Sequence, residues 1–464
     1  MIDLAHLEKY RENNRLEAKR AQGGLPRSIW ETYSAFANSF GGLILLGVIE
    51  TENKTLASVP LPDPEELVRQ FWQIVNDPAR VSANILRPTD VWVDESGGNR
   101  IVIIHVPRAD RHDRPVYLGT DPFSGAYRRG GEGDYHCSAE EVRAMMRDQA
   151  DLPRDLAPLE GLDQTALCPA AVARYRARLL RCRPGHVWGE LSDAGLLLRL
   201  GALTRAENGA LCPTAAGLLL LGEAWAIRSV WPHFCLSYRE QLQPGFACRL
   251  RSDGTGWNGA LFDFYFAAAH RICADPRLPG PADHPVQLAV REALANALIH
   301  ADYQDPRGLT IEKRSHQLYI TNPGCFRVEP SSALAGGISD ARNPGLSELF
   351  RLVGVGQRAG SGLPQIQAVW RLQGWEEPSI REDLRPGATC LRLTFAPRPA
   401  LPPRPAASGR QALLEYLTDQ VSASPAQLAG ALRLSSRQVC RMLARLAAIG
   451  AVEPAGAGSW RLKQ

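Results

Sequence analysis

The chain has 464 residues, of which 45% are hydrophobic and 22% are charged, and its formal net charge is +4. This length allows about two to four domains with sizeable cores. The near-neutral charge gives no chain-wide argument for nucleic-acid binding, so any basic surface must be local. The ten cysteines show neither CxxC pairs nor metal-ligand spacing, which argues against a disulfide framework and favours a cytoplasmic location. We find no signal peptide and no apolar run long enough to cross a membrane, so we expect no membrane contact.

The N-terminal part contains a short charged segment with the alternation of a strand. In residues 16–19, LEAK, apolar and charged side chains alternate, which places Glu17 and Lys19 on the same face. A helix is expected at 28–40, followed by a continuous buried strand at 43–50. From these residues alone, an edge strand that its charges keep soluble explains the pattern at least as well as a functional site does.

Ordered segments within residues 1–150 resemble the Schlafen-type AlbA-like domain, an α/β domain. They are ENNRLEAK at 12–19, AFANSFGGLILLGVIE at 35–50, RPVYL at 114–118 and AYRRGGEGDYHCSAEEV at 126–142. This family is described as nucleic-acid binding, and some members cut RNA. The chain departs from the family pattern at Ala18, where an aromatic residue is usual, and at Ile49, where a second acid is common.

Two functions fit this resemblance. A nucleic-acid-binding domain would contact phosphates through four basic side chains, Lys19, Arg114, Arg128 and Arg129. A nuclease would instead gather a divalent metal ion with three carboxylates, Glu12, Glu17 and Glu50. Lys19 would then steady the developing negative charge. Carboxylates beside one lysine are also what a salt-bridged strand end looks like.

The middle of the chain, residues 151–285, carries no chemistry that we can recognise. A proline-containing linker is expected at 150–160, followed by helices and strands. The expected elements are helices at 168–182, 190–200 and 257–274, and strands within 230–250. We interpret this segment as a connector to the domain that follows.

Residues 291–303, REALANALIHADY, are expected to form a helix with one polar face. Glu292, Asn296 and His300 are spaced i, i+4 and i+8, which places them one turn apart on that face. A carboxylate one turn from a carboxamide suits nucleotide chemistry, because the carboxylate can orient a water and the amide oxygen can ligate Mg²⁺. The same spacing also occurs on ordinary solvated helix faces.

The segments that follow favour the nucleotide interpretation. A strand running into a turn is expected at 318–326, a glycine-rich loop opening a helix at 356–366, and a last strand at 388–395. In this order, EALANALIHADY at 292–303, NPG at 322–324, RNP at 342–344 and GSG at 360–362 resemble the hallmarks of GHKL ATPases. The resemblance is to the divergent branch found in helicase-related bacterial transcriptional regulators.

This resemblance implies a GHKL-like α/β sandwich at residues 286–396 that binds ATP with Mg²⁺. Glu292 would be the water-activating base and Asn296 the Mg²⁺ ligand. Gly360 and Gly362 would cap the phosphates with backbone N–H groups. Asn322, followed by Gly324, stands where the family has an aspartate that accepts the adenine amino proton.

The C-terminal residues, 410–464, follow a Pro-rich linker at 397–409 and resemble a winged helix-turn-helix. Helices are expected at 410–420, 425–433 and 436–449, and a two-stranded wing follows. The third helix would enter the major groove and present Ser436, Arg437, Gln438 and Arg441 to DNA. A winged helix used for dimerisation or protein contact is the alternative.

Together these segments predict an α+β multidomain protein of the bacterial cytoplasm. The predicted function is DNA binding in transcriptional control, gated by ATP, by a homodimer. RNA is the alternative nucleic-acid partner. The rival function is a Schlafen-type metal-dependent nuclease that acts on tRNA or DNA in phage defence or stress response. In a third interpretation, the GHKL-like part is a degenerate scaffold.

Overall fold

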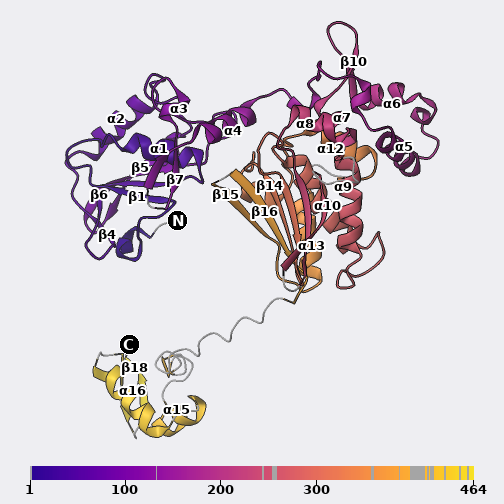
Figure 1. Ribbon diagram of the computed structural model, residues 1–464. Helices are drawn as coiled ribbons and strands as arrows, with labels where there is room; N and C mark the ends of the chain where they lie inside the picture. The colour runs from indigo at the N-terminus through magenta and orange to yellow at the C-terminus, as the bar shows by residue number, and fades with distance from the viewer. Residues whose placement is uncertain are drawn as a thin grey trace. The chain divides into compact units, whose positions relative to one another are not determined.

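The computed structural model is a mixed α+β multidomain protein with several separate sheets (Figure 1). The described residues are 3–131, 133–242, 245–252, 259–356, 360–385, 387–397, 413–414, 417, 423–432, 435–448, 451–456 and 459–463. Contacts divide the chain into two units, residues 1–396 and 397–464. The expected linker at 397–409 and helix at 410–420 fall almost wholly outside the described residues. None of the helices that are described is long and apolar enough to cross a membrane.

The N-terminal part of the first unit is built on a four-stranded sheet of order β1-β2-β6-β5. Its strands are β1 (Leu16–Lys19), β2 (Gly42–Leu46), β5 (Val91–Ser96) and β6 (Asn99–Val106). Helices α1 (Ile29–Asn38) and α2 (Pro64–Val75) pack apolar side chains on one face, and the short helix η1 (Leu4–Lys9) covers the other. The expected strand at 16–19 and the expected helix at 28–40 are therefore confirmed.

Gly47 breaks the continuous strand expected at 43–50. After this residue, β3 (Val48–Glu50) leaves the main sheet and pairs with β4 (Leu56–Ser58). Gly47 has a φ of +81°, and a Cβ at this position would meet Cγ of Leu61 at 2.8 Å. Only glycine fits this turn without strain.

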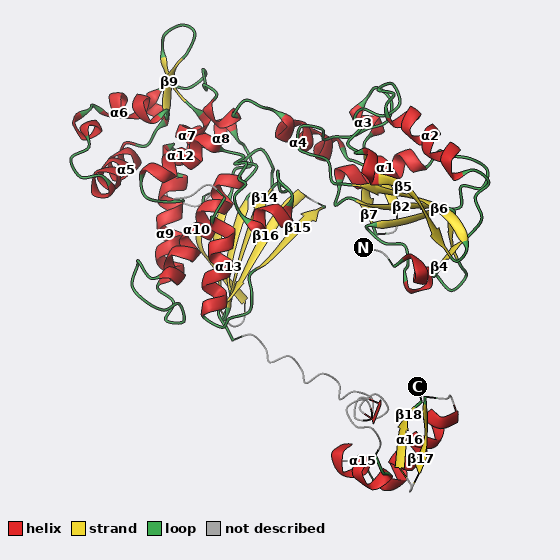
Figure 2. Cartoon of the chain, turned by 180° about the vertical axis from the view of Figure 1, so that it is seen from behind, coloured by secondary structure: helices red, strands yellow, loops and turns green. Residues whose placement is uncertain are grey.

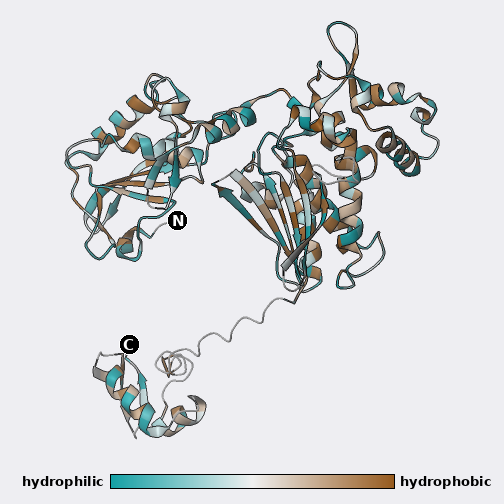
Figure 3. Cartoon of the chain, in the orientation of Figure 1, coloured by the Kyte–Doolittle hydropathy of each residue, from teal (hydrophilic) through white to brown (hydrophobic). Residues whose placement is uncertain are grey.

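Three further elements complete the N-terminal part. Strands β7 (Tyr127–Gly130) and β8 (Gly133–His136) form a hairpin that packs against α1. Helix α4 (Ala139–Gln149) follows, and it is largely hydrophilic along its length (Figure 3). Its N-terminus has a capping box in which Ser138 and Glu141 satisfy each other's backbone N–H groups.

The rest of the first unit is organised around a six-stranded sheet of order β12-β11-β13-β14-β16-β15. The strands are β11 (Leu236–Leu242), β12 (Gly245–Arg251), β13 (Leu309–Lys313), β14 (Gln317–Pro323), β15 (Ser379–Leu384) and β16 (Gly387–Thr394). Strands β11 and β13 are parallel, and the other neighbours are antiparallel. Three helices lie side by side over one face (Figure 2): α9 (Leu261–Cys273), α10 (Pro285–His300) and α13 (Gly362–Leu372).

One apolar core spans the expected connector and the expected GHKL-like part. Helices α5 (Pro169–Cys182), α6 (Asp193–Leu200) and α7 (Ala215–Leu221) contribute to it together with α9, α10 and α12 (Pro344–Leu352). Strand β11 of the connector pairs directly with β13. The expected boundary at 285 therefore lies within one packed body.

The second unit contains two described helices and a hairpin. They are α15 (Pro425–Leu432), α16 (Ser436–Ala448), β17 (Val452–Gly456) and β18 (Ser459–Leu462). On α16, Val439, Leu443 and Leu446 are buried in the core of this unit, as their helical spacing predicts. Ser424 caps α15 and Ser435 caps α16 through hydrogen bonds with the backbone N–H groups of Gln427 and Gln438.

Asp155, in the segment expected to be a linker, is a buried carboxylate at the N-terminus of α12. It is 3% exposed, and its Oδ2 accepts a hydrogen bond of 2.8 Å from the backbone N–H of Leu346. Its Oδ1 has no hydrogen-bond partner. Burial raises the pKa of Asp155 to about 6, against the effect of the backbone hydrogen bonds.

The raised pKa means that the folded state binds this proton more tightly than the unfolded state, whose carboxyl has the ordinary pKa of 3.8. The stabilisation is complete below pH 3.8 and is lost as the pH rises through about 6. Asp155→Asn keeps the acceptor and removes the charge, so we expect it to raise the free energy of unfolding at pH 8 by about 1–3 kcal/mol. Thermal melts at pH 4 and pH 8 measure the difference.

Asp163→Asn provides the control, because Asp163 is an exposed cap residue whose pKa is lowered by hydrogen bonds from Thr165. Relative to the parent protein, Asp163→Asn should therefore not become more stable between pH 4 and pH 8. An Asp155→Asn protein that is less stable than the parent at pH 8 would show that the buried charge is favourable.

Candidate functional site

A cavity of about 350 Å³ lies along the polar face of α10. Glu292, Asn296 and His300 all line it, so the sequence correctly predicts that the three share one helix face. The side of α10 away from the cavity is buried in the core through Val290, Leu294 and Leu298, whereas Ala297 lines the cavity. The other walls come from β14, β16, the start of α13 and the segment 325–342.

Glu292 and Asn296 form a hydrogen-bonded pair at the centre of this face. Burial raises the pKa of Glu292, and the hydrogen bond with Asn296 opposes this effect. A Cβ on Gly362, at the first position of α13, would lie 2.7 Å from both Glu292 Oε1 and Asn296 Nδ2. The first turn of α13 can therefore lie against the pair only because residue 362 is glycine.

Gly360 has a second, separate reason to be glycine. Its φ is +75°, and a Cβ there would meet the backbone N of Ile338 at 2.9 Å. The three residues before Gly360, 357–359, lie outside the described part of the chain. The structure thus brings both glycines of the expected phosphate cap to the cavity, while their role toward phosphate stays a prediction.

The opposite wall of the cavity holds Asn322 near the end of β14. Its side-chain Nδ2 lies 3.3 Å from the carbonyl oxygen of Pro323. Thr389 faces it across the ladder on β16, and its hydroxyl donates to the Gly324 carbonyl at 3.0 Å. Thr389 also lines the cavity but escaped the sequence analysis, because the register between β14 and β16 is not readable from either strand alone.

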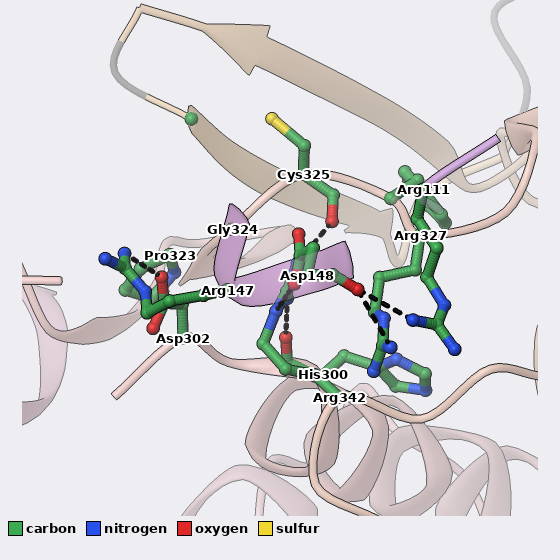
Figure 4. A network of polar contacts seen from close by, with 12 residues as sticks. Arg111, Arg147, Asp148, His300, Asp302, Pro323, Gly324, Cys325, Arg327 and Arg342 are labelled. Atoms are coloured by element: carbon green, nitrogen blue, oxygen red, sulfur yellow. Dashed lines mark hydrogen bonds and ion pairs between the residues drawn. The ribbon is translucent and has the colours of Figure 1, made fainter. Parts of the chain in front are cut away.

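Arg342, from the RNP segment, is the polar centre of the cavity wall (Figure 4). Its Nε and Nη2 donate to the two oxygens of Asp148 at 2.9 and 2.8 Å, and its guanidinium also donates to the carbonyls of His300 and Cys325. Burial is the largest single influence and lowers the pKa of Arg342, but the charge and hydrogen bonds of Asp148, together with the charge of Asp302, raise it overall. Burial, Arg342 and Arg327 together lower the pKa of His300 to about 4, so His300 is neutral at pH 7.

Asp148 lies at the end of α4, so Arg342 ties the N-terminal part to the cavity wall. Other ion pairs join the same two parts, namely Arg147–Asp302, Arg111–Asp340 and Arg108–Glu382. Asp340 also forms an ion pair of 3.5 Å with Arg327, which lines the cavity. The end of α4 is thus held to the rest of the unit by charge pairing, while its buried Val142 packs with Ala126 and Cys137 of the N-terminal part.

The N-terminal carboxylates lie near one another, and Glu17 is already paired with two cations. Glu17 binds Lys19 Nζ at 2.7 Å and Arg129 Nη2 at 2.7 Å. Glu12 accepts from the backbone N–H of Ala18, and burial, with the charges of Glu17 and Glu50, raises its pKa. The described residues contain no group of three or more His, Cys, Asp or Glu side chains placed to hold a metal ion. The nuclease role of these carboxylates stays a prediction.

Three of the arginines predicted to contact phosphates are buried or paired within the fold. Arg129 is 5% exposed and is held by Glu17 and by Asp134 at 2.9 Å. Arg128 pairs with Glu141 at 2.8 Å. Arg114 is 6% exposed. The role of these arginines toward phosphate stays a prediction.

In the second unit, the expected DNA-contacting residues lie on the outer face of α16. Ser436, Arg437, Gln438 and Arg441 are exposed. Gln438 also takes part in the cap of α16. Its Oε1 accepts hydrogen bonds from the backbone N–H of Ser435 at 3.0 Å and from the Ser435 hydroxyl at 2.9 Å. Its amide nitrogen remains the group that can reach outward.

Arg342→Ala should destabilise the first unit by about 3–5 kcal/mol, because it leaves the buried Asp148 carboxylate without its main partner. Chemical denaturation of the full chain measures this loss. Arg351→Ala is the matched control: Arg351 lines the same cavity, but its pair with Glu348 is about half exposed. That change should cost less than about 1 kcal/mol. Equal losses in the two variants would contradict the assigned importance of Arg342.

Comparisons with known proteins agree with the two-part organisation of the first unit. Residues 12–138 match the family model described as Schlafen, AlbA_2. Residues 307–389 match the model described as putative ATP-dependent DNA helicase recG C-terminal. Residues 143–237 match a domain of unknown function, DUF8451. No protein with a curated description matches the chain.

Two solved structures are similar. The N-terminal domain of a putative ATP-dependent DNA helicase RecG-related protein from Nitrosomonas europaea is 33% identical, covering 30% of this chain and 94% of that one, with a TM-score of 0.24. The DIP2311 protein from Corynebacterium diphtheriae is 20% identical, covering 97% of this chain and 79% of that one, with a TM-score of 0.39. The matches to the family models show that the chain joins a Schlafen AlbA_2 domain to a domain of the type described as putative ATP-dependent DNA helicase recG C-terminal.

Proposed function

We propose that this protein is a nucleic-acid-binding regulator that binds duplex DNA through its second unit and a nucleotide in the cavity along α10. In this proposal the second unit is a winged helix-turn-helix, the region 286–396 is a GHKL-like sandwich, and the working form is a cytoplasmic bacterial homodimer. The observation that carries the proposal is the basic outer face of α16.

Helix α16 separates apolar and basic side chains cleanly. Its buried face packs on the core of the unit, while Arg437, Arg441 and Arg445 are exposed and the helix contains no acidic residue. A helix of this kind can neutralise phosphates and offer arginine side chains to guanine edges in the major groove. The hairpin β17–β18 carries Lys463 just beyond it, whereas Arg461 is partly neutralised by Glu453.

The cavity along α10 fits a nucleotide in size and in chemistry. Its volume falls within the usual range for small-molecule sites, and apolar walls from β14, β16 and α13 suit a base. Asn322 offers an amide to the base edge, and the Asn296 carboxamide oxygen would ligate Mg²⁺. Gly362 lies directly against Glu292 and Asn296. A phosphate can therefore enter between α13 and this pair only if the first turn of α13 moves away.

The shared wall supports gating by that nucleotide. Arg327, Asp340 and Arg342 line the cavity, and the same three side chains hold residues of the N-terminal part. A ligand that shifts the segment 325–342 would therefore alter the ion pairs that fix α4. The matches to DNA-helicase-related and Schlafen proteins support a nucleic-acid partner for this arrangement.

Arg437→Ala with Arg441→Ala should weaken binding to a mixed-sequence duplex by at least about tenfold. Removing two phosphate-neutralising charges should also lower the slope of log affinity against log salt by about 2. Fluorescence anisotropy at several salt concentrations measures both effects. As a control, Arg371→Ala removes an exposed arginine from α13 in the first unit and should change neither quantity.

The same titrations distinguish the regulator from the nuclease when they are repeated with Mn²⁺ and with EDTA and analysed on gels. Intact, shifted DNA that is insensitive to EDTA agrees with the regulator. Mn²⁺-dependent cutting of DNA or tRNA that disappears in Glu17→Ala would make the protein a nuclease. Unchanged affinity in the double arginine variant would remove α16 from the DNA interface.

Asn296→Ala should weaken Mg²⁺-dependent ATP binding at least about tenfold, because the variant loses the proposed metal ligand. Binding measured with EDTA should change much less, since the base contacts remain. Titration of a fluorescent ATP analogue reports both values. Asn208→Ala, in an exposed turn of the same unit, is the control. Equal Mg²⁺-ATP affinity in Asn296→Ala and the parent would contradict the role of this side chain.

A further inference from the structure

A second cavity, of about 470 Å³, lies between the N-terminal part and the six-stranded sheet within the first unit. Helix α4 and strand β7 form one side of it. The other side is formed by the turn at 302–307 and the hairpin between β15 and β16. The Glu292–Asn296 pair does not line it, so it is distinct from the proposed nucleotide site. None of the functions proposed above uses this space.

The charged side chains of this cavity are mostly paired with each other or with near neighbours. Among its carboxylates, Asp148 binds Arg342, Asp302 binds Arg147 at 2.6 Å, Asp305 binds Arg307 and Glu141 binds Arg128. Glu140, the remaining acid of the lining, is exposed. Four of the five acids that line the cavity are therefore paired with other arginines, and none of the five forms an ion pair with Arg114.

Arg114 is the unusual member of the lining. It is 6% exposed, its Nη2 makes one long hydrogen bond of 3.4 Å to the carbonyl of Phe326, and its Nε has no hydrogen-bond partner. Among the described residues, no carboxylate forms an ion pair with it. Burial, followed by the like charge of Arg108, lowers the pKa of Arg114 to about 10, although the charges of Asp148 and Glu382 act in the opposite direction. A buried cation that is not paired with a carboxylate is unfavourable in a folded protein.

A second guanidinium on the same wall also has free donors. Arg128 binds Glu141 through Nε, but its Nη1 has no hydrogen-bond partner. Arg385, on the hairpin side, places its guanidinium over the ring of Tyr135, with 5.1 Å between its Cζ and the ring centroid. The cavity thus carries unsatisfied N–H donors on separate segments, and these donors suit an anion with several terminal oxygens.

We propose that this cavity binds a small phosphate-bearing anion whose oxygens are held by Arg114 and Arg128. A phosphate presents oxygens in several directions, whereas a carboxylate presents them in one plane. The volume exceeds that of a bare phosphate, and Ala144, Met145 and Leu384 supply an apolar wall for an organic group. Arg114 is too deeply buried for the backbone of a duplex to reach it. The proposal does not depend on the DNA-binding or nucleotide-binding roles above.

Thermal melts of the full chain test the proposal, with inorganic phosphate, AMP or NaCl added at matched ionic strength and without Mg²⁺. Phosphate or AMP should raise the melting temperature by at least about 2 °C above the NaCl value, because a ligand that binds only the folded state stabilises it. A larger shift with AMP identifies the ligand as an organic phosphate. An equal shift identifies it as free phosphate.

Arg114→Gln should abolish the shift and, without ligand, melt at the same or a higher temperature, because the unpaired charge is gone. Arg371→Gln removes an exposed charge and should retain the shift. If Arg114→Gln does not fold, Arg114→Lys is tested in its place. Lysine keeps the positive charge but lacks the planar guanidinium, so the phosphate-dependent rise in melting temperature should be smaller. A parent protein that shows no phosphate-dependent shift, or a full shift in the Arg114 variant, would overturn the proposal.

Discussion

The buried ion pair between Arg342 and Asp148 is the interaction on which the arrangement of the first unit depends. Its guanidinium reaches the end of α10 through the His300 carbonyl and the turn after β14 through the Cys325 carbonyl. Its carboxylate partner belongs to α4. Since removal of either partner would leave the other charge buried and alone, the helix, the turn and the N-terminal part must keep their relative positions.

Several arginines of the N-terminal part are used by the fold. Arg129 holds Glu17, Arg128 holds Glu141, and Arg108 holds Glu382 of the six-stranded sheet. Pairs of this kind fix geometry more than they add stability, because the desolvation of both charges offsets much of their attraction. The arginines of α16, by contrast, are exposed.

Two glycines, Gly360 and Gly362, allow the start of α13 to lie close to the polar face of α10. Gly362 allows the start of α13 to rest on the Glu292–Asn296 pair, and the positive φ of Gly360 turns the preceding loop into that helix. The paired residues are thus covered by the first turn of α13. Two cavities with different chemistry result, one with apolar walls for a base and one lined by arginines.

The sequence by itself determined the local features: the polar face of α10, the buried face and cap of α16, and the shared face of Glu17 and Lys19. Each follows from helical or strand periodicity over a few residues. Only the tertiary structure decided the break at Gly47, the pairing of Asn322 with Thr389, the single core across residue 285 and the burial of Arg114 and Arg129. The physical reason is distance along the chain: Arg342 and Asp148 are 194 residues apart. A charged side chain can therefore be buried by residues that are far from it in the sequence, either as ion-pair partners or as packing neighbours.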